Sequence, residues 1–208
     1  MLIAISDLSA LSAELLLERL ARLARAAKPN HVALLLRDHQ ASARHRLALG
    51  EELRAIAREH EQQLWVADRA DLALLLEADV LHLGEASAPA NVVRPLLPPQ
   101  LRISRAWHAP TWSDPALDAE LSGVDALLLS PLLAPRKGRP ALGLAALGVL
   151  GEQLRARHSA YPQIFALGGV SAENAAACLA AGAAGVAAIG AALGPDPAPL
   201  LDALAIAR

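Results

Sequence analysis

Three glycines in the last quarter of the chain form its clearest binding motif. Gly168 and Gly169 follow the apolar run 164–167, and Gly190 follows a second apolar run, 184–189. Glycine lets an anion come close to the backbone, and free N–H groups at the start of a helix attract phosphate. These residues predict a phosphate site made of backbone, although the glycines could instead only end the strands.

Polar and charged side chains follow other apolar runs of the sequence. They are Asp7, Arg37, Asp38, His39, Asp68, Glu85, His108 and Lys137. Histidine takes up and releases protons near neutral pH, carboxylates bind Mg²⁺, and arginine and lysine bind anions. Gathered at one place, such side chains could combine proton transfer with the binding of a phosphorylated compound.

Eight apolar runs alternate with segments of helical periodicity and would position these residues. The predicted strands are residues 2–5, 31–36, 63–67, 79–83, 101–107, 124–129, 164–167 and 184–189. The predicted helices are residues 12–27, 43–60, 70–77, 91–97, 114–121, 142–158, 172–181 and 197–207. Strict alternation predicts parallel strands with right-handed crossovers.

Eight such units favour a closed (β/α)₈ TIM barrel over an open sheet, and we expect one domain over residues 1–208. An open doubly wound sheet would be expected to carry a glycine-rich turn after its first strand. The chain has Ser6-Asp7-Leu8-Ser9 there. In a barrel, the residues at the carboxyl ends of the strands meet at one mouth, where active sites lie.

Composition narrows the function classes. The 208 residues carry a formal net charge of −2, so no overall basic field favours nucleic acid. No uninterrupted apolar run is long enough to span a bilayer, and the first residues lack the basic region of a signal peptide. We therefore expect a cytoplasmic protein that binds neither nucleic acid nor membrane.

Three segments of the chain resemble a known family. They are LWVADRADLALLLEADVLHLG (64–84), LLLSPLLAPRKG (127–138) and IFALGGVSAENAAACLAAGAAGVAAIGAAL (164–193). In this order and spacing they are similar to thiamine-phosphate synthase and its relative TenI, a thiazole tautomerase. The resemblance implies a barrel that holds the phosphate of a thiazole phosphate through backbone at Gly168, Gly169, Gly190 and Ala191. Barrels of this kind often form homodimers.

The synthases of this family join a pyrimidine pyrophosphate to a thiazole phosphate with Mg²⁺. On that interpretation Asp68 and Glu85 hold Mg²⁺, and Arg37, His39 and Lys137 bind substrate or pyrophosphate. The chain departs from the pattern in three places. The family's Asn-Asp is Ala67-Asp68, its Gln-Glu-Asp is Glu85-Ala86-Ser87, and its Thr-Pro-Thr-Lys is Ala134-Pro135-Arg136-Lys137.

The fifth predicted strand favours the TenI member of the pair. It ends in Trp107-His108, and in TenI a histidine at this place moves the proton that aromatises the thiazole. We therefore expect a TenI-like tautomerase with His108 as acid and base and no required cofactor. The alternatives are a Mg²⁺-dependent thiamine-phosphate synthase and a barrel that binds a thiamine precursor without catalysis.

Simpler roles remain open for several of these residues. His108 could be structural, Asp68 could cap the helix that begins at Ala70, and Arg37 could form a surface salt bridge. We expect His82 to point into the barrel and form a hydrogen bond there. The basic segment from Arg136 to Arg139 is either a lid over an anionic ligand or an exposed loop.

Overall fold

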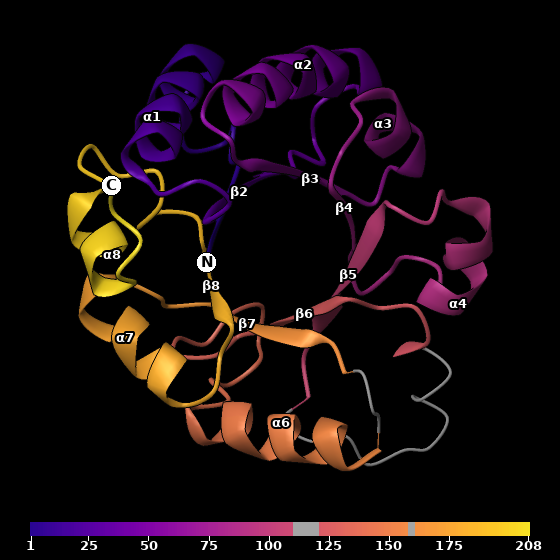
Figure 1. Cartoon of the computed structure of the whole chain (residues 1–208), viewed down its shortest axis with the longest axis vertical. Helices are drawn as coiled ribbons and strands as arrows, with labels where there is room; N and C mark the ends of the chain where they lie inside the picture. Colours follow the sequence, from indigo (N-terminus) through magenta and orange to yellow (C-terminus); the bar gives the residue numbers. More distant parts are fainter. Residues whose placement is uncertain (110–120, 158–160) are drawn as a thin grey trace.

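The protein is a closed parallel barrel surrounded by helices (Figure 1). The structure, a computed structural model, describes residues 1–109, 121–157 and 161–208. The strands are β1 (Leu2–Ile5), β2 (Val32–Leu36), β3 (Gln63–Ala67), β4 (Val80–Leu83), β5 (Arg102–Trp107), β6 (Ala126–Leu129), β7 (Gln163–Leu167) and β8 (Gly185–Ala188). They pair in chain order, and β8 closes the barrel against β1. The predicted (β/α)₈ barrel is therefore confirmed.

The helices lie outside the ring of strands (Figure 1). They are α1 (Ala13–Ala26), α2 (Ala43–Glu59), α3 (Ala70–Leu75), α4 (Ala90–Val93), the 3₁₀ helix η1 (Arg94–Leu96), α6 (Ala145–Arg157), α7 (Ala172–Ala180) and α8 (Ala198–Ala203). The predicted helix 114–121 lies outside the described residues except for its last position. In the part of the chain that the structure describes, no helix is long and apolar enough to cross a membrane.

Alternation along each strand divides the apolar residues into two sets. On β1, Leu2 and Ala4 pack outward against the helices, whereas Ile3 and Ile5 point into the barrel. Trp65 and Phe165 fill the middle of the interior, and their rings meet edge to face with centroids 6.0 Å apart. Toward the carboxyl ends of the strands the barrel opens into a cavity, and the inward residues nearest those ends form the floor of this cavity.

Several predicted helices are wrong in extent, and local causes explain the difference. The predicted helix 91–97 becomes the four-residue α4 followed by η1, because Pro95 lacks an N–H and cannot continue an α-helix. The predicted helix 142–158 begins only at Ala145. Gly143 has a φ of 78°, and its N–H donates to the carbonyl of Leu132 at 2.9 Å. This segment therefore belongs to the loop after β6.

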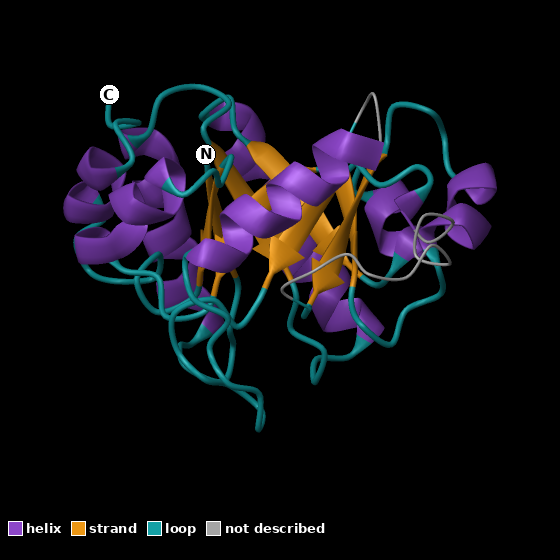
Figure 2. Ribbon diagram, turned by 90° about the horizontal axis from the view of Figure 1, so that it is seen from below, coloured by secondary structure: helices purple, strands orange, loops and turns teal. Residues whose placement is uncertain are grey.

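The last predicted helix is also shorter than expected, since α8 ends at Ala203 rather than at residue 207. Ala205 has a φ of 56°, which is outside the helical region and ends the last turn. Figure 2 shows the loops that follow the carboxyl ends of the strands gathered at one end of the barrel. The predicted site residues lie in these loops.

Candidate functional site

A cavity of about 770 Å³ opens at the carboxyl ends of the strands. Its floor is apolar and consists of Ile5, Leu35, Ala106, Leu128, Leu167 and Ile189. Its rim carries all the charged side chains that we predicted as ligands: Arg37, His39, Asp68, Glu85, His108 and Lys137. The volume and the apolar floor are those of a site for one or two small organic molecules.

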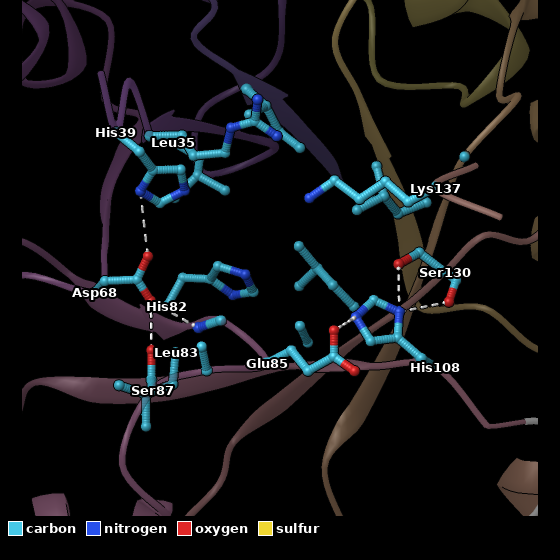
Figure 3. Close-up of a pocket in the computed structure, with 18 of the residues that line it drawn as sticks. Leu35, His39, Asp68, His82, Leu83, Glu85, Ser87, His108, Ser130 and Lys137 are labelled. Atoms are coloured by element: carbon cyan, nitrogen blue, oxygen red, sulfur yellow. Dashed lines mark hydrogen bonds and ion pairs between the residues drawn. The ribbon is translucent and has the colours of Figure 1, made fainter. Parts of the chain in front are cut away.

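Asp68 follows β3 with a φ of 62°, a left-handed conformation that aspartate adopts more readily than most residues. Its Oδ1 accepts hydrogen bonds from the N–H of Gly84 at 2.8 Å and from the hydroxyl of Ser87 at 2.5 Å (Figure 3). Burial raises the pKa of Asp68, but these hydrogen bonds outweigh it, and the pKa is lowered overall. Arg69, not Asp68, is the N-cap residue of α3. Asp68 is therefore an ionised carboxylate in the cavity wall.

His39 and Arg37 lie beside this carboxylate. Nδ1 of His39 is 3.4 Å from Oδ2 of Asp68 (Figure 3). Burial lowers the pKa of His39, and the attraction of Asp68 offsets only part of that effect. The hydroxyl of Ser6 donates to Asp38 and accepts the N–H of Arg37 at 3.0 Å, which fixes the end of β2. Nε of Arg37 is buried and has no hydrogen-bond partner among the described residues.

A second cluster surrounds His108. Its Nδ1 lies 2.7 Å from the backbone carbonyl oxygen of Ser130 and 3.1 Å from the Ser130 hydroxyl (Figure 3). A carbonyl oxygen can only accept, so Nδ1 carries the proton and the neutral ring has its lone pair on Nε2. Nε2 lies 3.7 Å from Oε2 of Glu85. His108 thus has one nitrogen fixed by the backbone and the other beside a carboxylate.

Lys137 enters the cavity from the tip of a short hairpin. Arg136 and Arg139 exchange backbone hydrogen bonds of 3.1 and 3.0 Å, and Lys137 and Gly138 between them have φ values of 51° and 75°. This is the geometry of a two-residue hairpin turn. Arg139 binds Glu85 at 2.5 Å and lowers the pKa of that carboxyl group. The basic segment is therefore tethered across the cavity, and Lys137 reaches into it opposite His39 (Figure 3).

The Gly168-Gly169 turn packs against the loop after β6. Their φ values are 103° and 76°, both in the region that favours glycine. A Cβ at Gly169 would lie 2.7 Å from the Cβ of Ala134. The carbonyl of Gly168 accepts the N–H of Leu133 at 2.8 Å. Close packing is therefore one reason for these glycines, and Gly168 also lines the cavity.

The N–H groups of the predicted phosphate site remain available. Within the described residues, the amides of Gly168, Gly169, Gly190 and Ala191 donate to no other protein group. A Cβ at Gly190 would meet open space. Of these four residues only Gly168 lines the cavity, while Gly169, Gly190 and Ala191 follow its lining residues Gly168 and Ile189. The four donors are thus free to bind an anion at this edge of the cavity, as in the phosphate sites of other barrels.

Two serines were missed by the sequence analysis. Ser130 holds His108, and Ser104 lies 2.9 Å from Nδ1 of His82 inside the barrel. The predicted internal hydrogen bond of His82 is thus present, but His82 also lines the cavity. The position of Ser130 directly after a strand could have identified it. Ser104 lies within a strand, and no sequence pattern singled it out.

Metal ligands are sparse in the cavity. Within the described ranges, no group of three or more His, Cys, Asp or Glu side chains could hold a metal ion. Asp68 keeps Oδ2 accessible beside His39, whereas both oxygens of Glu85 face Arg139 and His108. Mg²⁺ often uses one carboxylate together with substrate phosphates and water, so Asp68 alone fits that ion.

Comparison with known proteins identifies the family. A family model described as thiamine monophosphate synthase matches residues 3–192. The thiamine-phosphate synthase of Moorella thermoacetica is 37% identical over 167 residues, which cover 78% of this chain and 74% of that protein. That of Thermobifida fusca is 40% identical over 150 residues, covering 71% and 66%.

Other relatives extend these findings. The thiamine-phosphate synthase of Parasynechococcus marenigrum is 37% identical over 153 residues, and the match spans 41% of that longer protein. The solved structure of thiamine phosphate pyrophosphorylase from Pyrococcus furiosus is 27% identical. It has a TM-score of 0.77, and the match covers 98% of this chain and 95% of that one.

These relatives correct the predicted reaction. We expected a TenI-like tautomerase, but relatives 32–40% identical are named thiamine-phosphate synthase. The expectation rested on the similarity of the fifth strand and His108 to TenI and on the departures from the synthase pattern, but a histidine at this place is compatible with either enzyme. From the family model and these relatives, the chain belongs to the thiamine monophosphate synthase family.

Proposed function

We propose that the protein is a thiamine-phosphate synthase, which joins hydroxymethylpyrimidine pyrophosphate to thiazole phosphate. One observation carries this proposal: Arg37, His39 and Lys137 line the cavity, and the amides of Gly168-Gly169 and Gly190-Ala191, unpaired among the described residues, come directly after its lining residues Leu167 and Ile189. A tautomerase acting on one monophosphate needs only one set of anion-binding groups. A synthase must hold a monophosphate and a pyrophosphate at once, with the two rings between them.

The two sets of groups suggest where each substrate binds. The free amides of Gly168, Gly169, Gly190 and Ala191 would bind the phosphate of the thiazole. Arg37 and His39, with Lys137 reaching in from the opposite side of the cavity, would bind the pyrophosphate between them (Figure 3). Arg37 and Lys137 have no ion-pair partner among the described residues, so their charge is available to a ligand. The apolar floor would hold the two rings.

Asp68 is the residue that would hold Mg²⁺, together with pyrophosphate oxygens and water. Its lowered pKa keeps the carboxylate ionised at neutral pH. Mg²⁺, when bound, neutralises charge on the pyrophosphate leaving group. Ser87 stands where the family usually has an aspartate, so this chain supplies less negative charge to the ion. The basic pair Arg136 and Lys137 can supply part of the neutralisation instead.

The proposed reaction needs no proton transfer. The lone pair of the thiazole nitrogen forms a bond to the methylene carbon of the pyrimidine. The bond from that carbon to oxygen breaks, and pyrophosphate leaves with the electron pair. Arg37 and Lys137 stabilise the charge that develops on the leaving group. The apolar floor excludes water, which would otherwise capture the activated pyrimidine.

The first test compares binding with turnover. Calorimetry should show that each substrate binds in the presence of Mg²⁺, and omission of either substrate should abolish pyrophosphate release. Binding of both substrates without any release would leave a precursor-binding barrel and would contradict the synthase. A matched reaction with EDTA in place of Mg²⁺ should be inactive.

A further inference from the structure

His82 and Ser104 form a buried polar pair inside the barrel. They are direct partners in the register of β4 and β5, and both are in the inward-facing set. His82 is only 8% exposed, Ser104 is fully buried, and Nδ1 of the ring lies 2.9 Å from the serine hydroxyl. The ring lines the cavity, and Figure 3 shows it extending from β4 toward the centre.

The position of the proton follows from the hydroxyl group. A buried O–H needs an acceptor, and the imidazole of His82 is the acceptor that the described residues offer to Ser104. The serine therefore donates to Nδ1, which must be unprotonated. A neutral ring with a bare Nδ1 carries its proton on Nε2.

The Nε2 proton of His82 faces the cavity near its apolar floor. The opposite nitrogen is turned to Ser104, so the Nε2 edge is the one that a ligand meets. Leu35 and Ala106 lie among the apolar floor residues of the same cavity. In such surroundings a donor without a partner is costly, and a ligand that offers an acceptor is favoured.

The strand order indicates which ligand that is. β4 lies four strands from β8, across the barrel from the amides that we assign to the thiazole phosphate. It adjoins β3, whose end carries Asp68. The ring attached to the pyrophosphate is therefore the one within reach of His82. Pyrimidine nitrogens carry lone pairs in the plane of the ring and accept hydrogen bonds.

We propose that Nε2–H of His82 donates a hydrogen bond to a ring nitrogen of the pyrimidine substrate and that Ser104 sets this tautomer. The proposal rests on the proposed synthase function. It makes His82 a specificity-determining residue, because a ligand whose ring edge offers only donors or C–H groups would leave Nε2–H without a partner.

Nitrogen NMR of histidine-labelled protein tests the tautomer without any activity measurement. At pH 7, the His82 signals, assigned by their loss in His82→Gln, should show a protonated Nε2 and an unprotonated Nδ1. Addition of hydroxymethylpyrimidine pyrophosphate should shift the Nε2–H signal downfield, whereas inorganic pyrophosphate should not. A protonated Nδ1 in the free protein would overturn the proposal.

Calorimetry of variants tests the contact itself. His82→Phe should weaken binding of hydroxymethylpyrimidine pyrophosphate about tenfold and leave inorganic pyrophosphate unchanged. His82→Gln keeps a donor near the Nε2 position and should recover part of the loss. Ser104→Ala should cause a smaller loss than His82→Phe. His31→Gln, at a partly buried histidine outside the cavity on the loop before β2, is the matched control and should change nothing.

The outcomes separate the contact from the function. If His82→Phe weakens the binding of both pyrophosphate compounds equally, His82 has a structural role. If it weakens the binding of neither, His82 makes no contact with the ligand. Each would overturn the proposal while the wild-type synthase activity stands. A wild-type protein that binds inorganic pyrophosphate but not the pyrimidine substrate would overturn the proposed function and this contact with it.

Discussion

Oδ1 of Asp68 accepts the N–H of Gly84 at 2.8 Å, which joins the ends of β3 and β4 and leaves Oδ2 toward His39. A Cβ at Gly84 would lie 3.0 Å from that Oδ1, so glycine permits the approach. Because the carboxylate is fixed through one oxygen, the other is presented to the cavity. Oδ2 is therefore the oxygen of Asp68 that a metal ion in the cavity would reach.

On the synthase proposal, Asp68→Asn should abolish the Mg²⁺ dependence and lower kcat/KM by about 100-fold or more, since it removes the charge proposed to hold the ion. Steady-state rates against Mg²⁺ concentration measure this effect. Ser87→Asp restores the aspartate usual in the family and should lower the Mg²⁺ concentration needed for half-maximal rate. Unchanged Mg²⁺ dependence in both variants would place the ion elsewhere.

If the protein is the proposed synthase, Lys137→Ala should lower kcat/KM for the pyrimidine substrate by about 10- to 100-fold, because the proposal assigns its ammonium group to the leaving group. The fold should be unaffected, since Lys137 lies at the tip of an exposed hairpin. Arg25→Ala removes an exposed charge from the last turn of α1 and should have no effect. Equal rates for Lys137→Ala and Arg25→Ala would remove Lys137 from the site.

Gly169 and Gly190 are both predicted to bind phosphate, but replacing each of them with alanine should have a different effect. Gly169→Ala places a Cβ 2.7 Å from Ala134 at a φ of 76°, and it should destabilise the protein by about 2–4 kcal/mol. Gly190→Ala places its methyl group in open space. It should keep the stability and weaken thiazole phosphate binding about tenfold. Urea unfolding and calorimetry measure the two effects.

The buried histidine predicts a pH dependence of stability. The pKa of His82 is lowered to about 4, whereas a histidine in the unfolded chain has a pKa of about 6.5. Between these values the unfolded state binds more protons, so stability from this group is complete above pH ~6.5 and is lost as the pH falls toward 4. The loss is at most about 3 kcal/mol.

Urea unfolding at pH 7.5 and pH 5 measures this dependence. The free energy of unfolding should fall more between the two pH values in the wild type than in His82→Gln, which has no titrating group at this position. Parallel changes in both proteins would show that His82 does not titrate as its burial implies.

The barrel could be predicted from the sequence because parallel strands and helices impose different periods on the apolar residues. The strand 63–67, for example, is predicted with the bounds that the structure has. The segment before α6 could not be predicted in this way. Its pairing with the loop after β6, through Leu142 and Pro131, is a long-range contact that no local pattern encodes.

The candidate site, like the fold, could be predicted from the sequence only in part. Strand ends identified Asp68, His108 and Lys137 as cavity residues, because barrel topology brings such ends together. Which partner each side chain has could not be predicted. The sequence assigns Glu85 to Mg²⁺ only on the synthase alternative, and in the structure it pairs with Arg139, which lies 54 positions further along the chain.

The most direct test of the synthase proposal is the product stoichiometry of a reaction with both substrates and Mg²⁺. Mass spectrometry and a pyrophosphate assay should find thiamine phosphate and pyrophosphate in a one-to-one ratio, both rising linearly with enzyme concentration. Intact substrates after prolonged incubation of a folded protein that binds both would contradict the account.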